Sequence, residues 1–355
     1  MTEAQQRAAL TLQTQQEVIF DSMIEGLLLL DERGRIQLAN RAFLTLFGLT
    51  SDPRGRTIIE ALRLHELAAL VTSLDTNKQV LGYELKLPGL TERWLQINAA
   101  AIFNGPGERH GTVLVFHDQT RLKQLESARQ EFVANVSHEL RTPLSLIKGY
   151  AETLLDGARE DPEVATRFLQ TIDRNAERLR LLIEDLLTIS EFEAGRVKLN
   201  LQAVALPPVV AKVLEDFKGR AAARGVTLLN HAPDLAVRAD INRLEQVLGN
   251  LVDNAIKYGR ANGTVTVGGQ AAERGQAEVF VQDDGPGIPP EALERVFERF
   301  YRVDKARSRE QGGTGLGLAI VKHLVQSHGG RVWATSEPGR GAVFYFVLSQ
   351  DPGAQ

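Results

Sequence analysis

The 355-residue sequence contains no cysteine, which excludes disulfides, thiolate metal sites and cysteine nucleophiles. Long hydrophobic runs are also missing, because residues 26–30 and 97–103 fall far short of the roughly 18 residues that a membrane-spanning helix needs. The polar, glutamine-rich stretch 1–16 lacks the apolar centre of a signal peptide. We therefore expect a cytoplasmic protein with no membrane span, unless an anchor has been removed.

Charge of one sign is not in large excess, since the formal net charge is −4 with 24% charged residues. Such a balance creates no field that would gather nucleic acid or an anionic membrane, so no direct nucleic-acid binding is expected. Hydrophobic residues make up 43% of the chain, and a chain of this length can form two or three domains with separate cores.

Residues 17–118 follow the polar segment 1–16 and combine short strand patterns with short helical pieces. Strands are expected at residues 27–30, 35–39, 80–87, 94–103 and 111–116, and a helix at 40–47. This mixture predicts a small α+β domain with an antiparallel sheet.

Residues 119–196 have a helical pattern. At about 100° per residue, one narrow apolar stripe consists of Leu122, Leu125, Phe132, Val136, Leu140, Pro143 and Ile147. Turn residues follow at 157–162, and a second stripe runs from Phe168 to Ile189 before Gly195 ends it. Because one helical hairpin cannot bury both stripes against itself, we expect a homodimer that forms a four-helix bundle.

The last region, residues 197–350, alternates strand and helix patterns. Strands are expected at 263–268, 277–282, 331–336 and 342–348, and helices at 207–224, 241–258 and 315–328. The region predicts a two-layer α/β sandwich, so the whole chain is expected to be a multidomain α+β protein.

His138 lies roughly opposite the apolar stripe of its helix and is expected to point into solvent. Most lone exposed histidines are ordinary surface residues, but the neighbours of this one favour a chemical role. Glu139 can accept a hydrogen bond from one ring nitrogen, which leaves the other as a nucleophile. Thr142 projects from the same side one turn later, and Pro143 predicts a bend beside the ring.

Four later stretches have the composition of a nucleotide site. The helix 241–258 carries amides and a lysine suited to Mg²⁺ and phosphate: Asn250, Asn254 and Lys257, with Tyr258 adjacent. Residues 283–287 (Asp-Asp-Gly-Pro-Gly) place a carboxylate at a strand end, where it can accept a hydrogen bond from an exocyclic amine. The polar stretch 302–312 is a candidate lid, and residues 313–318 (Gly-Thr-Gly-Leu-Gly-Leu) open a helix that favours phosphate. Taken singly, each stretch also has a structural explanation, such as a polar helix face, a turn or a dinucleotide-binding loop.

The segment 132–143 resembles the phosphoacceptor box of the histidine kinases of two-component signalling. The four later stretches resemble the asparagine, first glycine, phenylalanine and second glycine boxes of the histidine-kinase ATPase domain, whose fold is shared with the gyrase, Hsp90 and MutL ATPases. The resemblance implies that His138 accepts the γ-phosphoryl group of ATP, that Glu139 is the general base, and that Thr142 helps to position water in a phosphatase reaction.

In the nucleotide site the resemblance implies that Asn254 ligates Mg²⁺, Asp283 binds the adenine amine, and Lys257 and Arg302 contact phosphates. The other residues expected at the ATP site are Asn250, Tyr258, Gly285, Gly287, Gly313, Thr314, Gly315, Leu316 and Gly317. Hydrolysing relatives carry a glutamate four residues before the metal asparagine, where this chain has Asn250. This difference favours transfer to a protein side chain. The resemblance implies that His138 then passes the phosphoryl group to an aspartate of a response-regulator receiver domain. An ATP-driven conformational machine and a non-enzymatic scaffold remain the alternatives.

Residues 17–118 resemble a PAS sensor domain through the segments 31–36, 39–43 and 118–120. Asp118 and Thr120 are expected to cap the start of the long helix. The sequence does not identify a ligand of the sensor, and we expect His65, His110 and His117 to be solvated or structural. Among sensor histidine kinases the chain is expected to be similar to a phosphate-sensor-like subgroup, here without a membrane anchor.

Overall fold

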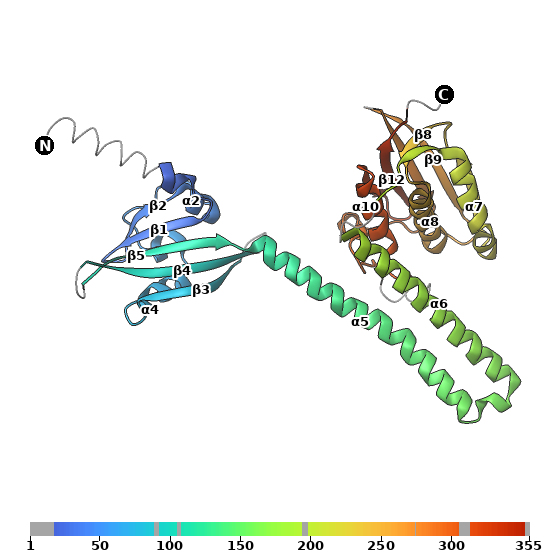
Figure 1. The fold of residues 1–355 in the computed structure, drawn as a ribbon, viewed down its shortest axis with the longest axis horizontal. Coiled ribbons are helices and arrows are strands. Elements are labelled where there is room, and N and C mark those ends of the chain that lie inside the picture. Colours follow the sequence, from blue (N-terminus) through green and yellow to red (C-terminus); the bar gives the residue numbers. More distant parts are fainter. Residues whose placement is uncertain are drawn as a thin grey trace. The chain divides into compact units, whose positions relative to one another are not determined.

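The computed structural model describes residues 18–88, 92–104, 108–193, 198–273, 275–304 and 313–351 (Figure 1). The chain divides into two compact units, residues 1–131 and 132–355, and each is described by itself. The predicted helix end at Gly195 and most of the predicted lid lie outside the described residues. None of the described helices is both long enough and apolar enough to cross a membrane.

The N-terminal unit contains a five-stranded antiparallel sheet in the order β2-β1-β5-β4-β3 (Figure 1). Its strands are β1 (Gly26–Asp31), β2 (Ile36–Ala39), β3 (Gln79–Leu87), β4 (Arg93–Asn104) and β5 (Glu108–Asp118). The helices are α2 (Arg41–Phe47), α3 (Ile58–Leu62) and α4 (His65–Ser73). The prediction of an antiparallel α+β domain is confirmed, but α3 and α4 were not predicted.

Alternating residues of these strands form the core of the unit, in which Leu28, Ile97 and Phe116 are fully buried. Asn40 is also fully buried, and its side chain accepts hydrogen bonds from the amides of Leu27 and Phe43. It donates in turn to the carbonyls of residues 20 and 25. All the hydrogen-bonding capacity of this amide is therefore used to join α2 to β1 and to the segment that precedes it.

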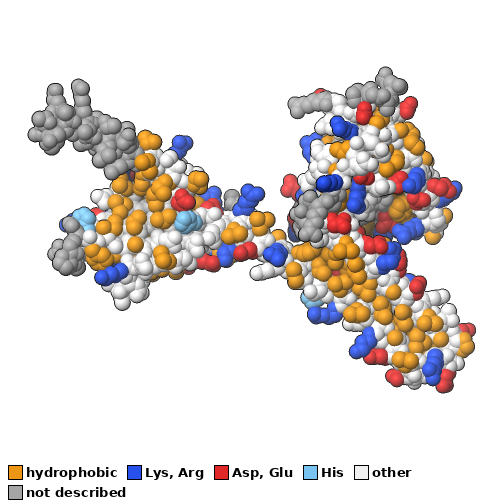
Figure 2. All heavy atoms as spheres, viewed as in Figure 1, with side chains coloured by type: hydrophobic (Ala, Val, Ile, Leu, Met, Phe, Trp, Pro, Cys, Tyr) orange, Lys and Arg blue, Asp and Glu red, His pale blue; other side chains and the backbone are white. Residues whose placement is uncertain are grey.

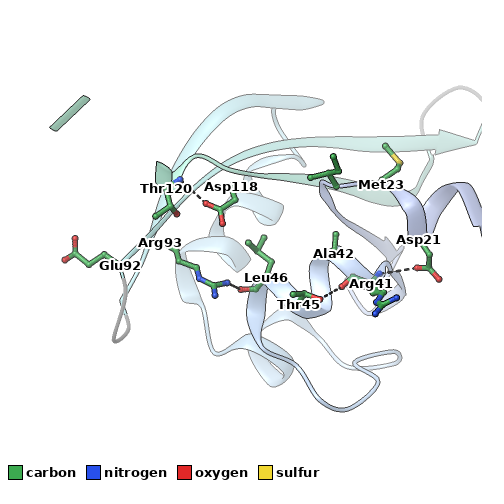
Figure 3. Close-up of a pocket in the computed structure, with 11 residues that line it drawn as sticks. Asp21, Met23, Arg41, Ala42, Thr45, Leu46, Glu92, Arg93, Asp118 and Thr120 are labelled. Atoms are coloured by element: carbon green, nitrogen blue, oxygen red, sulfur yellow. Dashed lines mark hydrogen bonds between the residues drawn. The ribbon is translucent and has the colours of Figure 1, made fainter. Parts of the chain in front are cut away.

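A surface pocket of about 630 Å³ lies where the chain enters and leaves this unit (Figure 3). Asp21 accepts a hydrogen bond from the amide of Arg41 at 3.1 Å, and the Arg93 guanidinium donates to the carbonyl of residue 46 at 2.7 Å. Asp118 accepts from the amide of Thr120 at 2.9 Å at the start of the long helix, whereas the Thr120 hydroxyl, which was also expected to cap this helix, accepts from the amide of Trp94 at 3.0 Å.

The helical hairpin consists of α5 (Thr120–Leu155), the short 3₁₀ helix η1 (Ala158–Glu160) and α6 (Pro162–Glu193). Helix α5 continues through Pro143. Apolar side chains line the surface of the hairpin in the single chain (Figure 2), and the exposed ones include Leu144, Leu146, Leu155, Leu169 and Leu187. The predicted hairpin is confirmed, with an apolar surface that the single chain leaves uncovered.

The C-terminal part contains a five-stranded sheet in the order β11-β12-β10-β9-β7 and a two-stranded sheet, β6-β8. The strands are β6 (Gln202–Ala205), β7 (Thr227–His231), β8 (Ala236–Ala239), β9 (Thr264–Ala272), β10 (Gln276–Asp283), β11 (Arg331–Ser336) and β12 (Ala342–Ser349). Helices α7 (Leu206–Ala223), α8 (Ile241–Tyr258) and α10 (Gly317–Ser327) pack on the large sheet through one shared core (Figure 1). This is the expected two-layer sandwich, although β6, β7 and β8 were not predicted.

Helix α8 is held at both ends. Asp240 caps its N-terminus by accepting from the amides of residues 242 and 243, and the Asp240 amide donates to Nε2 of the buried His328 at 3.1 Å. At the other end the Arg224 guanidinium donates to the carbonyls of Ile256 and Lys257. These contacts satisfy backbone groups that a helix leaves unpaired, so α8 is fixed as one wall of the site described next.

Candidate active site

A cavity of about 620 Å³ lies between α6, α7, α8 and the segment before α10. This volume is within the range of small-molecule sites. The predicted nucleotide residues that line the cavity are Asn250, Asn254, Lys257, Tyr258, Asp283, Gly287, Arg302, Gly313, Thr314, Gly315 and Gly317. Gly285 and Leu316 do not line it, so the structure brings together the predicted residues with two exceptions.

The wall formed by α8 carries three of the polar groups. Asn250 uses its side-chain nitrogen to donate to the carbonyl of Gly317 at 3.3 Å, which ties α8 to the first turn of α10. Lys257 forms an ion pair with Asp253 at 2.6 Å. Asn254 makes no side-chain hydrogen bond to another described residue, so its amide oxygen is available to a ligand in the cavity.

Asp283 stands at the end of β10 with an exposed fraction of 6%. Its Oδ1 accepts a hydrogen bond from the amide of Gly285 at 2.8 Å, and burial raises the pKa of the carboxyl above its ordinary value. A Cβ atom at position 285 would lie 2.7 Å from the carbonyl oxygen of Tyr258. Gly285 therefore acts behind the cavity wall, where it allows the turn that fixes Asp283.

The glycine-rich segment joins the cavity to two neighbouring elements. Gly315 has a φ of +74°, and its carbonyl accepts a hydrogen bond from Phe300, whose own φ is +60°. The Thr314 hydroxyl donates to Asp185 of α6 at 2.9 Å. The Leu316 side chain is fully buried in the core, and its amide donates to the Thr314 hydroxyl at 3.2 Å.

His138 is exposed on α5, as its position on the helical wheel predicted. The Thr142 hydroxyl donates to the backbone carbonyl of His138 at 3.2 Å, so in this structure it is turned toward its own helix. No hydrogen bond joins Glu139 to the His138 ring among the described residues. Instead Oε2 of Glu139 accepts from Arg178 at 3.0 Å and from Arg302 at 3.2 Å. Two guanidinium groups bind a carboxylate more strongly than a neutral imidazole does, which explains the difference from the expected pairing.

Arg302 has a side chain that is only 6% exposed. Besides Glu139 it binds the carbonyl of Gly313 at 2.7 Å. It therefore connects helix α5 with the glycine-rich segment, and the sequence predicted a phosphate contact for this arginine.

Several residues of the site were not identified from the sequence. Asp185 and Leu181 of α6 and Phe217 and Arg220 of α7 also line the cavity. Burial raises the pKa of the Asp185 carboxyl, while its hydrogen bond from Thr314 opposes that shift. In the sequence, Asp185 stands out only by its position beside the apolar stripe of α6. A solvent-exposed aspartate can occupy the same position, so the sequence does not identify Asp185 as a site residue.

The residues present fit a nucleotide that carries its own magnesium ion. Among the described residues no group of three or more histidine, aspartate or glutamate side chains could hold a metal. A single neutral amide at Asn254 suits Mg²⁺, which usually keeps several waters and binds substrate phosphates. The cavity is also lined by the buried Asp283 carboxylate and by the apolar side chains of Ile288 and Phe344, which together suit an aromatic ring with an exocyclic amine.

Three parts of the chain match family models in order. Residues 14–119 match the PAS fold, residues 128–195 match the His Kinase A (phospho-acceptor) domain, and residues 239–352 match the histidine kinase-, DNA gyrase B- and HSP90-like ATPases. These segments agree with the order of sensor, hairpin and sandwich described above.

Curated relatives are WalK proteins. The chain is 36% identical over 330 residues to the sensor histidine kinase WalK of Bacillus subtilis, a match that covers 92% of this chain and 54% of the relative. A sensor protein kinase WalK of Staphylococcus aureus is 34% identical over 334 residues, which cover 93% of this chain and 79% of that relative. The chain thus spans about half the length of the first curated relatives that it matches.

Solved structures of histidine kinases are similar to the chain. The histidine kinase ThkA, in complex with the response regulator protein TrrA, is 25% identical with a TM-score of 0.51, and the match covers 93% of this chain and 97% of that one. The Acinetobacter baumannii histidine kinase AdeS is 28% identical with a TM-score of 0.51, over 60% of this chain and 98% of that one. The chain belongs to the family of WalK-type sensor histidine kinases.

Proposed function

We propose that this chain is an ATP-dependent protein-histidine kinase that phosphorylates its own His138 and passes the phosphoryl group to an aspartate of a response regulator. One observation carries the proposal. Arg302, at the edge of the cavity, binds Glu139, the residue next to His138, at 3.2 Å. This contact links an exposed histidine to a cavity that has the polar groups of a nucleotide site.

In the proposed reaction a ring nitrogen of His138 forms a bond to the γ-phosphorus as the bond to the bridging oxygen breaks. ADP leaves with that electron pair, and Glu139 receives the proton of the other ring nitrogen. Lys257 and Arg302 neutralise charge on the phosphates. Asn254 would hold Mg²⁺, which supplies further neutralisation of phosphate charge when it is bound with ATP.

The residues that line the cavity favour transfer of the phosphoryl group to a side chain over hydrolysis of ATP. A hydrolase needs a base to activate water, and Asn250 at the relevant position has no proton-accepting carboxylate. Its side-chain nitrogen is also engaged with the carbonyl of Gly317. Asp185, which does reach the cavity, is held by the hydroxyl of Thr314.

We propose two partners. The first is a receiver domain, which the complex of the relative ThkA with TrrA supports, and toward which Thr142 serves a phosphatase reaction. The second is another copy of this chain, because several leucine side chains of the hairpin are exposed, among them Leu144 at 59% and Leu187 at 59%. Pairing of two hairpins into a four-helix bundle buries such a surface. We assign residues 17–118 to the sensor, 119–196 to the hairpin domain and 197–350 to the ATP-binding domain.

Incubation with γ-labelled ATP and Mg²⁺ tests the proposal. A histidine kinase acquires a label that is stable in alkali and labile in acid, and His138→Gln removes it. A scaffold stays unlabelled, and a hydrolase releases phosphate regardless of His138. His110→Gln, a change of another exposed histidine, is the matched control and keeps the label. Label that survives His138→Gln would refute the assignment of the acceptor.

A further inference from the structure

Two arginines from distant segments bind the same oxygen of Glu139. Arg178 of α6 donates to Oε2 at 3.0 Å, and Arg302 donates to Oε2 at 3.2 Å. The side chains of Arg178, Arg302 and Glu139 are 20%, 6% and 17% exposed, so this cluster is shielded from water. Charge-assisted hydrogen bonds in such surroundings are stronger than ion pairs at an open surface.

The other oxygen of Glu139, Oε1, accepts no hydrogen bond from another described residue. The two guanidinium groups therefore hold the carboxylate by one oxygen and leave the second available. His138 directly precedes Glu139 on α5, so its imidazole is a suitable donor to Oε1 when the ring turns toward it.

The two arginines differ in their other contacts. Arg302 uses the same nitrogen, Nη2, for Glu139 and for the carbonyl of Gly313, and it lines the nucleotide cavity. Phosphate groups that enter the cavity compete with Glu139 for this guanidinium. Arg178 has no hydrogen-bond partner other than Glu139 among the described residues, and it does not line the cavity.

Loss of Arg302 to phosphate would leave the shielded carboxylate with one cation. A buried charge that loses its partners is costly, so a second cation is needed if Glu139 is to stay in place while ATP is bound. Arg178 meets this need because it belongs to α6, the other helix of the hairpin, and does not line the cavity. It can therefore stay bound to Glu139 when Arg302 moves to the phosphates.

We propose that Arg178 is a positioning residue for phosphoryl transfer. It holds Oε2 of Glu139 in place when Arg302 leaves Glu139 and binds the phosphates of ATP. Oε1 of Glu139 then receives the ring proton of His138. This inference rests on the proposed histidine kinase function. Arg178 acts through Glu139 and touches neither the nucleotide nor the reacting nitrogen.

The first test is the rate of autophosphorylation of Arg178→Gln in the full chain. The maximal rate falls by about 10- to 100-fold, the scale of misplacing a catalytic group, while KM for ATP is unchanged. Arg178→Lys keeps a cation and restores part of the rate. The matched control is Arg180→Gln two residues along α6, because Arg180 pairs with Glu177 and Glu184 on its own helix and lies outside the cluster. A normal rate in Arg178→Gln overturns the proposal.

The second test separates positioning from a merely structural ion pair. In a Glu139→Gln background, where the base is already absent, Arg178→Gln causes no further loss of rate if it acts through Glu139. An equal loss in both backgrounds shows an independent, structural effect and also overturns the proposal. Thermal unfolding of each variant shows that the comparison concerns folded protein.

Labelling of the unsubstituted chain distinguishes failure of this inference from failure of the proposed function. If the unsubstituted chain acquires no label at His138, the histidine kinase assignment itself is wrong. If it is labelled normally and the two tests above fail, the kinase assignment stands and the role of Arg178 is withdrawn.

Discussion

Replacement of Asp283 by asparagine tests how the cavity recognises a base. The carboxylate accepts backbone hydrogen bonds from Gly285, at 2.8 Å, and from Ala342, and its remaining acceptor capacity faces the cavity. In Asp283→Asn the amide oxygen keeps the backbone contacts, so the amide nitrogen faces the cavity. A donor then meets the exocyclic amine of adenine, which is itself a donor.

The loss of a hydrogen bond to a charged acceptor costs about 1.5–3 kcal/mol. ATP affinity should therefore fall by about 10- to 150-fold, since about 1.4 kcal/mol corresponds to a factor of ten. GTP, which has a carbonyl in place of that amine, should lose less affinity. Titration calorimetry with both nucleotides measures the ratio, and equal losses for ATP and GTP would refute the assigned contact.

The same variant has a pH signature without nucleotide. Burial raises the pKa of Asp283 above its ordinary value of 3.8, so the native state binds this proton more tightly than the unfolded state. This difference in proton binding contributes fully to the free energy of unfolding below the ordinary pKa of the unfolded state. The contribution is lost as pH rises through the raised pKa of the native state. Asparagine does not titrate, so the stability of the parent relative to Asp283→Asn should fall over that window. Urea unfolding at several pH values measures this, and a constant difference would contradict the argument.

Three further predictions concern the loop, the core and the dimer. Gly315→Ala should lower the free energy of unfolding in urea by about 1–3 kcal/mol, because φ is +74° and the new Cβ would lie 2.9 Å from Cα of Phe300. The control Gly317→Ala, whose new Cβ would have no contact shorter than 3.8 Å, should have little effect. His328→Phe should lower the free energy of unfolding by about 1–3 kcal/mol, because the Asp240 amide loses its acceptor, and retained stability would show that this bond is dispensable. The double variant Leu144→Glu/Leu187→Glu should sediment as a monomer where the parent sediments as a dimer, and an intact dimer would place the interface elsewhere.

The fold was predictable where the hydrophobic pattern is long. Helix α8 has a strongly apolar face, and the predicted bounds 241–258 agree with the structure. Strands β6 (Gln-Ala-Val-Ala) and β8 (Ala-Val-Arg-Ala) are short and, unlike β2, show no alternation of apolar and polar residues. Helix α3 has five residues, but Thr57 and Glu60 form a capping box that was a usable signal.

The site was predictable where its residues lie on one element. Asn250, Asn254 and Lys257 share one helix, and their common side follows from helical spacing alone. The contact of Thr314 with Asp185 joins residues 129 positions apart, and that of Arg302 with Glu139 spans 163 positions. Which cation binds Glu139 depends on tertiary packing, so the sequence indicated the carboxylate but not its partners.

The fixation of α8 at both ends has a consequence for inhibitor chemistry. Asp240 with His328 and Arg224 with the last carbonyls hold this helix, and the segment around Gly315 also lines the cavity. A rigid compound that binds Asn254 and Asp283 would therefore meet, at Asn254, a helix that is held by contacts outside the cavity. Selectivity among related kinases would have to come from groups that reach toward Thr314 and Asp185, on the side where the cavity meets the hairpin.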